Sequence, residues 1–140
     1  MGVYIFSQAI NEDEAYEEAR FILDAVKGYN LELPVVYDPE HIRNKKARTD
    51  DISGEQFTKN AIKFCETVKA EGYKPMIYSN IIWETEVLDL KALKDYEIWY
   101  ADYERLPQTP YNYSFWQYSC TGKVNGISGN VDLDIQMIKK

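Results

Sequence analysis

Short apolar runs recur along the first eighty residues and predict three buried strands. Residues 2–7 are rich in side chains that favour strands, and residues 74–79 have the same character. Residues 33–38 are apolar without alternation, as expected for a parallel strand that is covered on both faces. The three runs are separated by longer, more polar segments, which is the spacing of strands joined by helices.

The segments between these runs show the three-to-four-residue apolar spacing of amphipathic helices. Residues 11–27 carry one apolar stripe, and Asn11 is positioned to cap this helix. Ser53 is positioned to cap a second helix, which Gly72 should end. Both caps have a potential reciprocal partner three residues on. A third, short helix is expected at residues 88–93.

The pattern changes in the last third of the chain. Residues 97–102, 114–119 and 130–135 predict strands, and turn-rich loops without helices connect them. The whole order is therefore strand, helix, strand, helix, strand, short helix and three further strands. This order predicts a single α/β domain over residues 1–140, an irregular TIM-like (β/α) barrel that is wound regularly at first and irregularly later.

Composition adds an indication of the ligand. The 140 residues are enough for one domain with a core of its own. Aromatic residues make up 14% of the chain and 12 residues are Tyr, whose flat apolar face and edge hydroxyl suit a sugar. A Tyr-rich core without any ligand would produce the same composition.

Charge and residue counts exclude several classes of function. The net charge of −7 makes nucleic acid and anionic membranes poor partners, and no apolar run approaches the length of a membrane span. One His and two Cys leave little room for a zinc site or for Ser-His or Cys-His catalysis. Cys65 lies on an apolar helical stripe and is expected to be a buried free thiol. Any chemistry should therefore be done by carboxylates, without a metal or cofactor.

Asp38 and Glu40 are the strongest catalytic candidates, because they lie where functional groups gather in an α/β barrel, at the C-terminal end of a strand. Two residues apart on an extended segment, they project to the same side with Cα atoms roughly 6.6 Å apart. Hydrolysis of a glycosidic bond needs a protonated carboxylic acid and a negative group, and neighbouring carboxylates raise one another's pKa. A pair of solvated loop carboxylates is the alternative interpretation.

Six segments in a fixed order point to a family. Together they resemble the glycoside hydrolase family 25 lysozymes, also called Chalaropsis-type N-acetylmuramidases. The resemblance implies an irregular barrel of eight strands that cleaves, with retention, the β-1,4 bond between N-acetylmuramic acid and N-acetylglucosamine in peptidoglycan. The segments are Gly-Val-Tyr-Ile-Phe-Ser at 2–7, Pro-Val-Val-Tyr-Asp-Pro-Glu at 34–40, Gly-Tyr-Lys-Pro-Met-Ile-Tyr at 72–78, Trp-Tyr-Ala-Asp-Tyr at 99–103, Phe-Trp-Gln-Tyr at 115–118 and Gly-Ile-Ser-Gly-Asn-Val-Asp at 126–132.

The resemblance also assigns roles to residues. Glu40 corresponds to the family's general acid, Asp38 to the residue that orients or stabilises the substrate's acetamido group, and Asp132 to a further active-site aspartate. For the Trp residues, plain core packing is the alternative. The residues expected to line or closely underlie the saccharide groove are Tyr4, Phe6, Tyr78, Trp99, Asp102 and Trp116.

The chain departs from the family pattern at its start, where residues 2–7 resemble the family's third strand. A barrel limited to roughly the third through eighth strands is therefore expected, without the family's first-strand aspartate. The alternatives to a muramidase are then an inactive remnant that binds glycan, or a chain that only self-associates through exposed strand edges. His41 is expected to be a rim residue, and the basic loop at 43–48 a solvated one.

Overall fold

The computed structural model describes residues 1–42 and 47–138, so Arg43, Lys45 and Lys46 of the predicted basic loop lie outside the described residues. The described chain forms six strands, two α-helices and one π-helical turn. In chain order these elements are β1 (Val3–Ser7), α1 (Glu12–Ala25), β2 (Val35–Pro39), α2 (Gly54–Ala70), β3 (Pro75–Ser79), η1 (Trp83–Val87), β4 (Glu97–Ala101), β5 (Phe115–Gly122) and β6 (Val131–Gln136).

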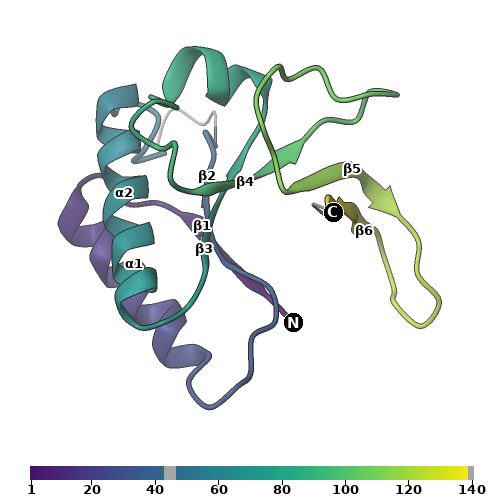
Figure 1. Cartoon of the computed structure of the whole chain (residues 1–140), viewed down its shortest axis with the longest axis horizontal. Coiled ribbons are helices and arrows are strands. Elements are labelled where there is room, and N and C mark those ends of the chain that lie inside the picture. Colours follow the sequence, from purple (N-terminus) through teal and green to yellow (C-terminus); the bar gives the residue numbers. More distant parts are fainter. Residues whose placement is uncertain (43–46, 139–140) are drawn as a thin grey trace.

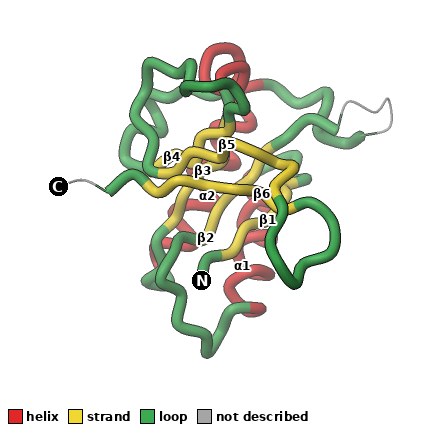
Figure 2. Tube along the Cα trace, turned by 90° about the vertical axis from the view of Figure 1, so that its right-hand side faces the viewer, coloured by secondary structure: helices red, strands yellow, loops and turns green. Residues whose placement is uncertain are grey.

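The strands form one sheet in sequence order, from β1 at one edge to β6 at the other. The first five strands are parallel, and β6 runs antiparallel to β5 with two irregularities in the register. The sheet curls, so that α1 and α2 lie side by side against its convex face while β5 and β6 turn away on the other side (Figure 1). The view in Figure 2 shows β6 crossing in front of the other strands. The fold is a curled half-barrel of the predicted α/β class.

Both predicted helix starts are confirmed, because each depends on a local hydrogen bond. The side chain of Asn11 accepts from the backbone N–H of Glu14 at 2.9 Å, and that of Ser53 accepts from the N–H of Gln56 at 3.1 Å. The reciprocal bonds differ from the expectation. Glu14 accepts from the N–H of Ile10 at 3.1 Å instead of that of Asn11.

The prediction of a helix at residues 88–93 is wrong, because that segment forms a series of turns. The predicted cap residue still acts locally, since Asp89 Oδ1 accepts from the N–H groups of Lys91 and Ala92. The helical turn lies earlier, at η1, where Asn80 Oδ1 accepts from the N–H of Trp83 at 3.2 Å.

Alternation along the strands divides the side chains between two faces. Tyr37 of β2 and Tyr100 of β4 point to the convex face, where they pack with the helices in the main core. Val36 and Met76 belong to a smaller cluster on the concave face. Cys65 of α2 is buried and free, as predicted. Within the described residues, no helix has the length and apolar character needed to cross a membrane.

Candidate active site

A cavity of about 260 Å³ opens on the concave side of the sheet, near the C-terminal ends of β1, β2 and β3. We call it the acidic cleft, because it contains all three carboxylates predicted to be catalytic. Its remaining described lining is aromatic apart from one amide, and none of the described side chains that line it is basic. The cleft is lined by Tyr4, Phe6, Asp38, Glu40, Tyr78, Trp99, Tyr103, Gln117 and Asp132.

Strand alternation explains why these side chains meet. On β2, Tyr37 enters the convex core, so its neighbour Asp38 faces the concave side, and Glu40 follows one residue beyond the strand. Asp132 arrives from the other edge of the sheet, at the start of β6. Because β6 is antiparallel to β5, its first residues lie at the same end of the sheet as the last residues of the parallel strands.

The carboxylates of the cleft perturb one another. Asp38 is 7% exposed, and its Oδ1 atom is buried without a hydrogen-bond partner among the described residues. Burial, followed by the charges of Glu40 and Asp132, raises the pKa of Asp38 to about 7. Burial and the charge of Asp132 also raise the pKa of Glu40 above its usual range. The cleft can therefore hold a proton on a carboxyl group at neutral pH.

Aromatic rings form one wall of the cleft. The Tyr78 and Trp99 rings meet edge to face with centroids 4.9 Å apart, and the rings of Tyr4 and Trp99 are 6.1 Å apart. Trp99 is fixed further by its Nε1–H, which donates to Asp134 Oδ1 at 2.7 Å. Three predicted groove residues, Tyr4, Tyr78 and Trp99, thus form an aromatic surface beside the acids, of the kind on which sugar rings pack.

The sequence of the chain matches a known protein family. The sequence profile of the family described as glycosyl hydrolases family 25 matches residues 1–127. The chain belongs to glycosyl hydrolase family 25. The resemblance inferred from the six sequence segments is therefore confirmed, and the half-barrel is part of the family 25 fold.

Relatives of known name and structure agree with this membership. The autolytic lysozyme of Clostridium acetobutylicum is 27% identical over 96% of this chain and 38% of its own length. The crystal structure of the bacterial lysozyme from Streptomyces coelicolor has a TM-score of 0.79 and 25% identity, over 96% of this chain and 66% of that one. The modular autolysin LytC from Streptococcus pneumoniae, in complex with a synthetic peptidoglycan ligand, has a TM-score of 0.77 and 28% identity, over 94% of this chain and 32% of that one.

The chain spans less than half the length of the curated relatives that it matches. The matched share is 38% of the Clostridium lysozyme and 47% of the YegX protein of Escherichia coli K12, to which the chain is 31% identical. The solved structures are also longer than this chain, because its match covers 32% of the LytC chain and 66% of the Streptomyces lysozyme chain.

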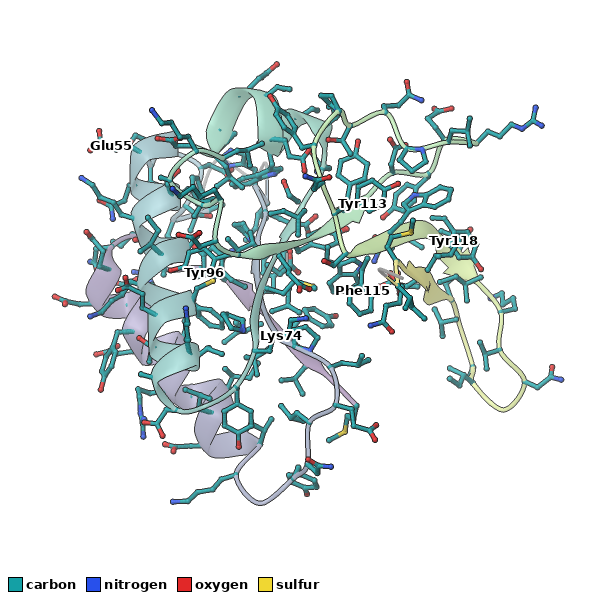
Figure 3. All side chains as sticks on the ribbon, in the orientation of Figure 1. Glu55, Lys74, Tyr96, Tyr113, Phe115 and Tyr118 are labelled. Carbon is teal, nitrogen blue, oxygen red and sulfur yellow. The ribbon has the colours of Figure 1, made fainter. Side chains whose placement is uncertain are left out.

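Two of the residues predicted to bind substrate, Asp102 and Trp116, are not among the described residues that line the acidic cleft. Asp102 uses its carboxylate within its own loop, where it accepts from the Tyr100 hydroxyl at 3.0 Å and from the N–H of Gln108 at 2.8 Å. Trp116 packs against the main core, and its Nε1–H donates to the backbone oxygen of Asp102 at 2.8 Å. Alternation along β5 thus places Trp116 on the face opposite to Gln117. Figure 3 shows this strand, with Phe115 at its start and Tyr118 further along.

Gln117 and Tyr103 line the cleft but were absent from the sequence prediction. Both lie inside segments that carried the family resemblance, so the signal was present in the sequence. Because side chains alternate along a strand, Trp116 and Gln117 of β5 face opposite sides of the sheet, and only one of them can line the cleft. The aromatic character of Trp116 favoured Trp116 over Gln117 in the sequence prediction.

Within the described residues, no group of three or more His, Cys, Asp or Glu side chains has an arrangement that could hold a metal ion.

Proposed function

We propose that this chain is a peptidoglycan hydrolase that cleaves the β-1,4 bond between N-acetylmuramic acid and N-acetylglucosamine. The observation that carries the proposal is the pair Asp38 and Glu40, two carboxyl groups of raised pKa side by side in one cleft. Glycoside hydrolysis needs this combination of a proton donor and a second carboxyl group. The names of the family 25 relatives, a lysozyme and an autolysin studied with a peptidoglycan ligand, support the same substrate.

Glu40 is the proposed general acid. It is only partly buried, so its proton can reach a glycosidic oxygen in the cleft, whereas Asp38 is 7% exposed and lies deeper. Glu40 gives its proton to the leaving oxygen as the bond from that oxygen to the anomeric carbon breaks. A water molecule then supplies a hydroxyl group to this carbon and returns a proton to Glu40, with overall retention of configuration.

Asp38 and Asp132 have supporting roles in this proposal. Asp38 orients the 2-acetamido group of the sugar and stabilises charge that develops near the anomeric carbon. Burial raises the pKa of both other carboxyl groups and the negative charge of Asp132 adds to this shift, which favours the protonated form of the acid. The rings of Tyr78 and Trp99 support the face of the sugar beside these groups.

The identity of the new chain ends tests the proposal. Purified peptidoglycan is digested with the chain, the products are reduced with borohydride, and the reduced sugars are identified by mass spectrometry. We expect muramitol, because cleavage after N-acetylmuramic acid leaves that sugar at the reducing end. Reduced glucosamine or free amino groups would show a different bond specificity. Binding to peptidoglycan without any release of products would support the alternative of a glycan-binding remnant.

A further inference from the structure

The side chain of Gln117 is held by two hydroxyl groups from different parts of the sheet. Tyr78 of β3 donates to Gln117 Oε1 at 2.8 Å, and Tyr103, which follows β4, donates to the same oxygen at 2.7 Å. A carbonyl oxygen has two lone pairs, so these two donors saturate it. Gln117 itself is only 3% exposed. Three separate segments of the chain therefore cooperate to fix one amide group.

Fixing the oxygen of a planar amide also fixes its nitrogen. Among the described residues, no acceptor for Gln117 Nε2 is found, and Nε2 is not one of the buried atoms that lack a partner. The atom thus stays accessible, and the space that Gln117 lines is the acidic cleft. The two N–H groups of this amide are available to a ligand in the cleft.

The other donors of the cleft are already engaged. The Nε1–H of Trp99 is bonded to Asp134, and the hydroxyls of Tyr78 and Tyr103 are bonded to Gln117. Tyr4 stands at the open side and is 57% exposed. The remaining polar groups are carboxyl groups, which accept hydrogen bonds when ionised. Among the described residues, Gln117 Nε2 is therefore a donor deep in the cleft that keeps its hydrogens whatever the protonation of the carboxyl groups.

The two tyrosines keep their protons over a wide pH range. Burial, with the neighbouring Tyr103 and the carboxylates of the cleft, raises the pKa of Tyr78 far above its ordinary value. Burial also raises the pKa of Tyr103 to about 12. Both hydroxyls consequently remain donors at neutral and mildly alkaline pH, and the orientation of the amide is maintained.

We propose that Gln117 determines specificity for N-acetylated sugars by donating a hydrogen bond from Nε2 to the carbonyl oxygen of a 2-acetamido group. This inference rests on the proposed function, because it places a sugar in the acidic cleft. A sugar hydroxyl can donate to the carboxylates and needs no donor from the protein. A carbonyl oxygen can only accept, so it needs a donor, and Gln117 Nε2 is a donor that does not depend on the protonation of a carboxyl group.

Two neutral oligosaccharides test this assignment. Tri-N-acetylchitotriose carries acetamido groups, and cellotriose has hydroxyl groups in their place. The dissociation constant of each is measured by NMR titration of the full chain, wild type and Gln117→Glu. Glutamate still offers an oxygen to Tyr78 and Tyr103 but lacks the N–H groups, and the titration is made at mildly alkaline pH to favour its ionised form, which cannot donate. We expect Gln117→Glu to weaken binding of tri-N-acetylchitotriose by about fivefold, the usual scale of one hydrogen bond, and to change binding of cellotriose little.

Two further variants serve as controls. Gln136→Glu makes the same charge change at an exposed position at the far end of β6, and both oligosaccharides should bind to it as to wild type. Tyr103→Phe removes one of the two donors that hold the amide. Tyr103→Phe should weaken binding of only the N-acetylated ligand, about twofold. If thermal melting shows that Gln117→Glu is unfolded, Tyr103→Phe tests the role of Gln117 in its place.

The outcomes separate this inference from the proposed function. Equal weakening of both oligosaccharides by Gln117→Glu would overturn the specificity role and leave the proposed function intact. Wild-type affinity of Gln117→Glu for tri-N-acetylchitotriose would do the same. If the wild-type chain binds neither oligosaccharide, the acidic cleft is not a glycan site, and the proposed function fails together with the role of Gln117.

Discussion

Asp38 shows how a residue suited to catalysis can weaken the fold that carries it. Its carboxyl group is almost completely buried, one of its oxygens has no hydrogen-bond partner among the described residues, and the negative charges of Glu40 and Asp132 act on it. Each of these features disfavours the charged form. The folded state therefore binds a proton that the unfolded chain has already released, in the range between the ordinary pKa of 3.8 and the folded value of about 7.

This linkage predicts the pH dependence of a variant. Because the folded-state pKa is raised, the contribution of Asp38 to stability is fully present below pH 3.8 and is lost as pH rises to about 7. Asp38→Asn removes the titration, so its stability relative to wild type should increase over this range, by at most about 4 kcal/mol, and then level off. Urea unfolding at several pH values measures the difference. A difference that is independent of pH would contradict the account of Asp38.

The sequence located the carboxylates more reliably than the groups that surround them. Asp38 and Glu40 were predictable because a strand end and a two-residue spacing are local features. Asp132 required the family resemblance, because its neighbours in space come from the opposite edge of the sheet. The role of Gln117 depends on hydroxyl groups that lie 39 and 14 residues away in sequence, and no local pattern marks such a contact.

Among the secondary-structure elements, α2 and η1 pack together and hold His41 at the rim of the acidic cleft, next to Glu40. The ring of His41, next to Glu40, stacks on Trp83 of η1 with centroids 4.9 Å apart and meets the edge of Phe57 of α2 at 5.3 Å. His41 is thus part of a rim contact, as the sequence suggested. The short helix was misplaced in the prediction because η1 depends on such tertiary contacts. For example, the N–H of Asp89, just after η1, donates to Thr58 of α2 at 3.0 Å.

Gly54 makes this contact possible and offers a test of it. A Cβ atom at Gly54 would lie 2.3 Å from the backbone oxygen of Val87, which would force the start of α2 away from η1. Gly54→Ala should therefore lower the free energy of unfolding by about 1 to 3 kcal/mol, although alanine is the better helix former. Glu55→Ala is the matched control, because Glu55 lies at the outer end of α2 and faces solvent (Figure 3). Its effect should stay within about 0.5 kcal/mol.

Chemical denaturation of both variants provides the measurement. Equal stability of Gly54→Ala and wild type would show that α2 and η1 can separate without cost. The close contact would then have no part in holding the rim beside Glu40.

On the scale of the whole molecule, the sheet is open, and β1 lies at one of its two edges. Within the described residues, β1 is paired only with β2, so its other edge offers free backbone donors and acceptors. Val3–Ser7 contains no charged residue or proline, the features that normally protect an edge from pairing with another chain. The opposite edge, β6, carries Asp132 and Asp134. We propose that two copies of the chain associate through β1.

Analytical ultracentrifugation at several concentrations tests this association. We expect the sedimentation coefficient of the wild-type chain to rise with concentration, and Tyr4→Lys to reduce the effect by placing a charge on the edge strand. Tyr29→Lys makes the same change at an exposed site between α1 and β2 and should leave association unchanged. A monomer at all concentrations, or equal effects of the two substitutions, would count against pairing through β1.

Glu40 is proposed to be the acid with which the acidic cleft hydrolyses glycan. The direct test compares wild type, Glu40→Gln and the exposed control Glu17→Gln in two assays, release of reducing sugar from peptidoglycan and binding of tri-N-acetylchitotriose. We predict that Glu40→Gln lowers the rate of release by 10²-fold or more, the usual scale of general acid catalysis, while binding is retained. Glu17→Gln should match wild type in both assays. Release of reducing sugar by Glu40→Gln at the wild-type rate would contradict the central claim.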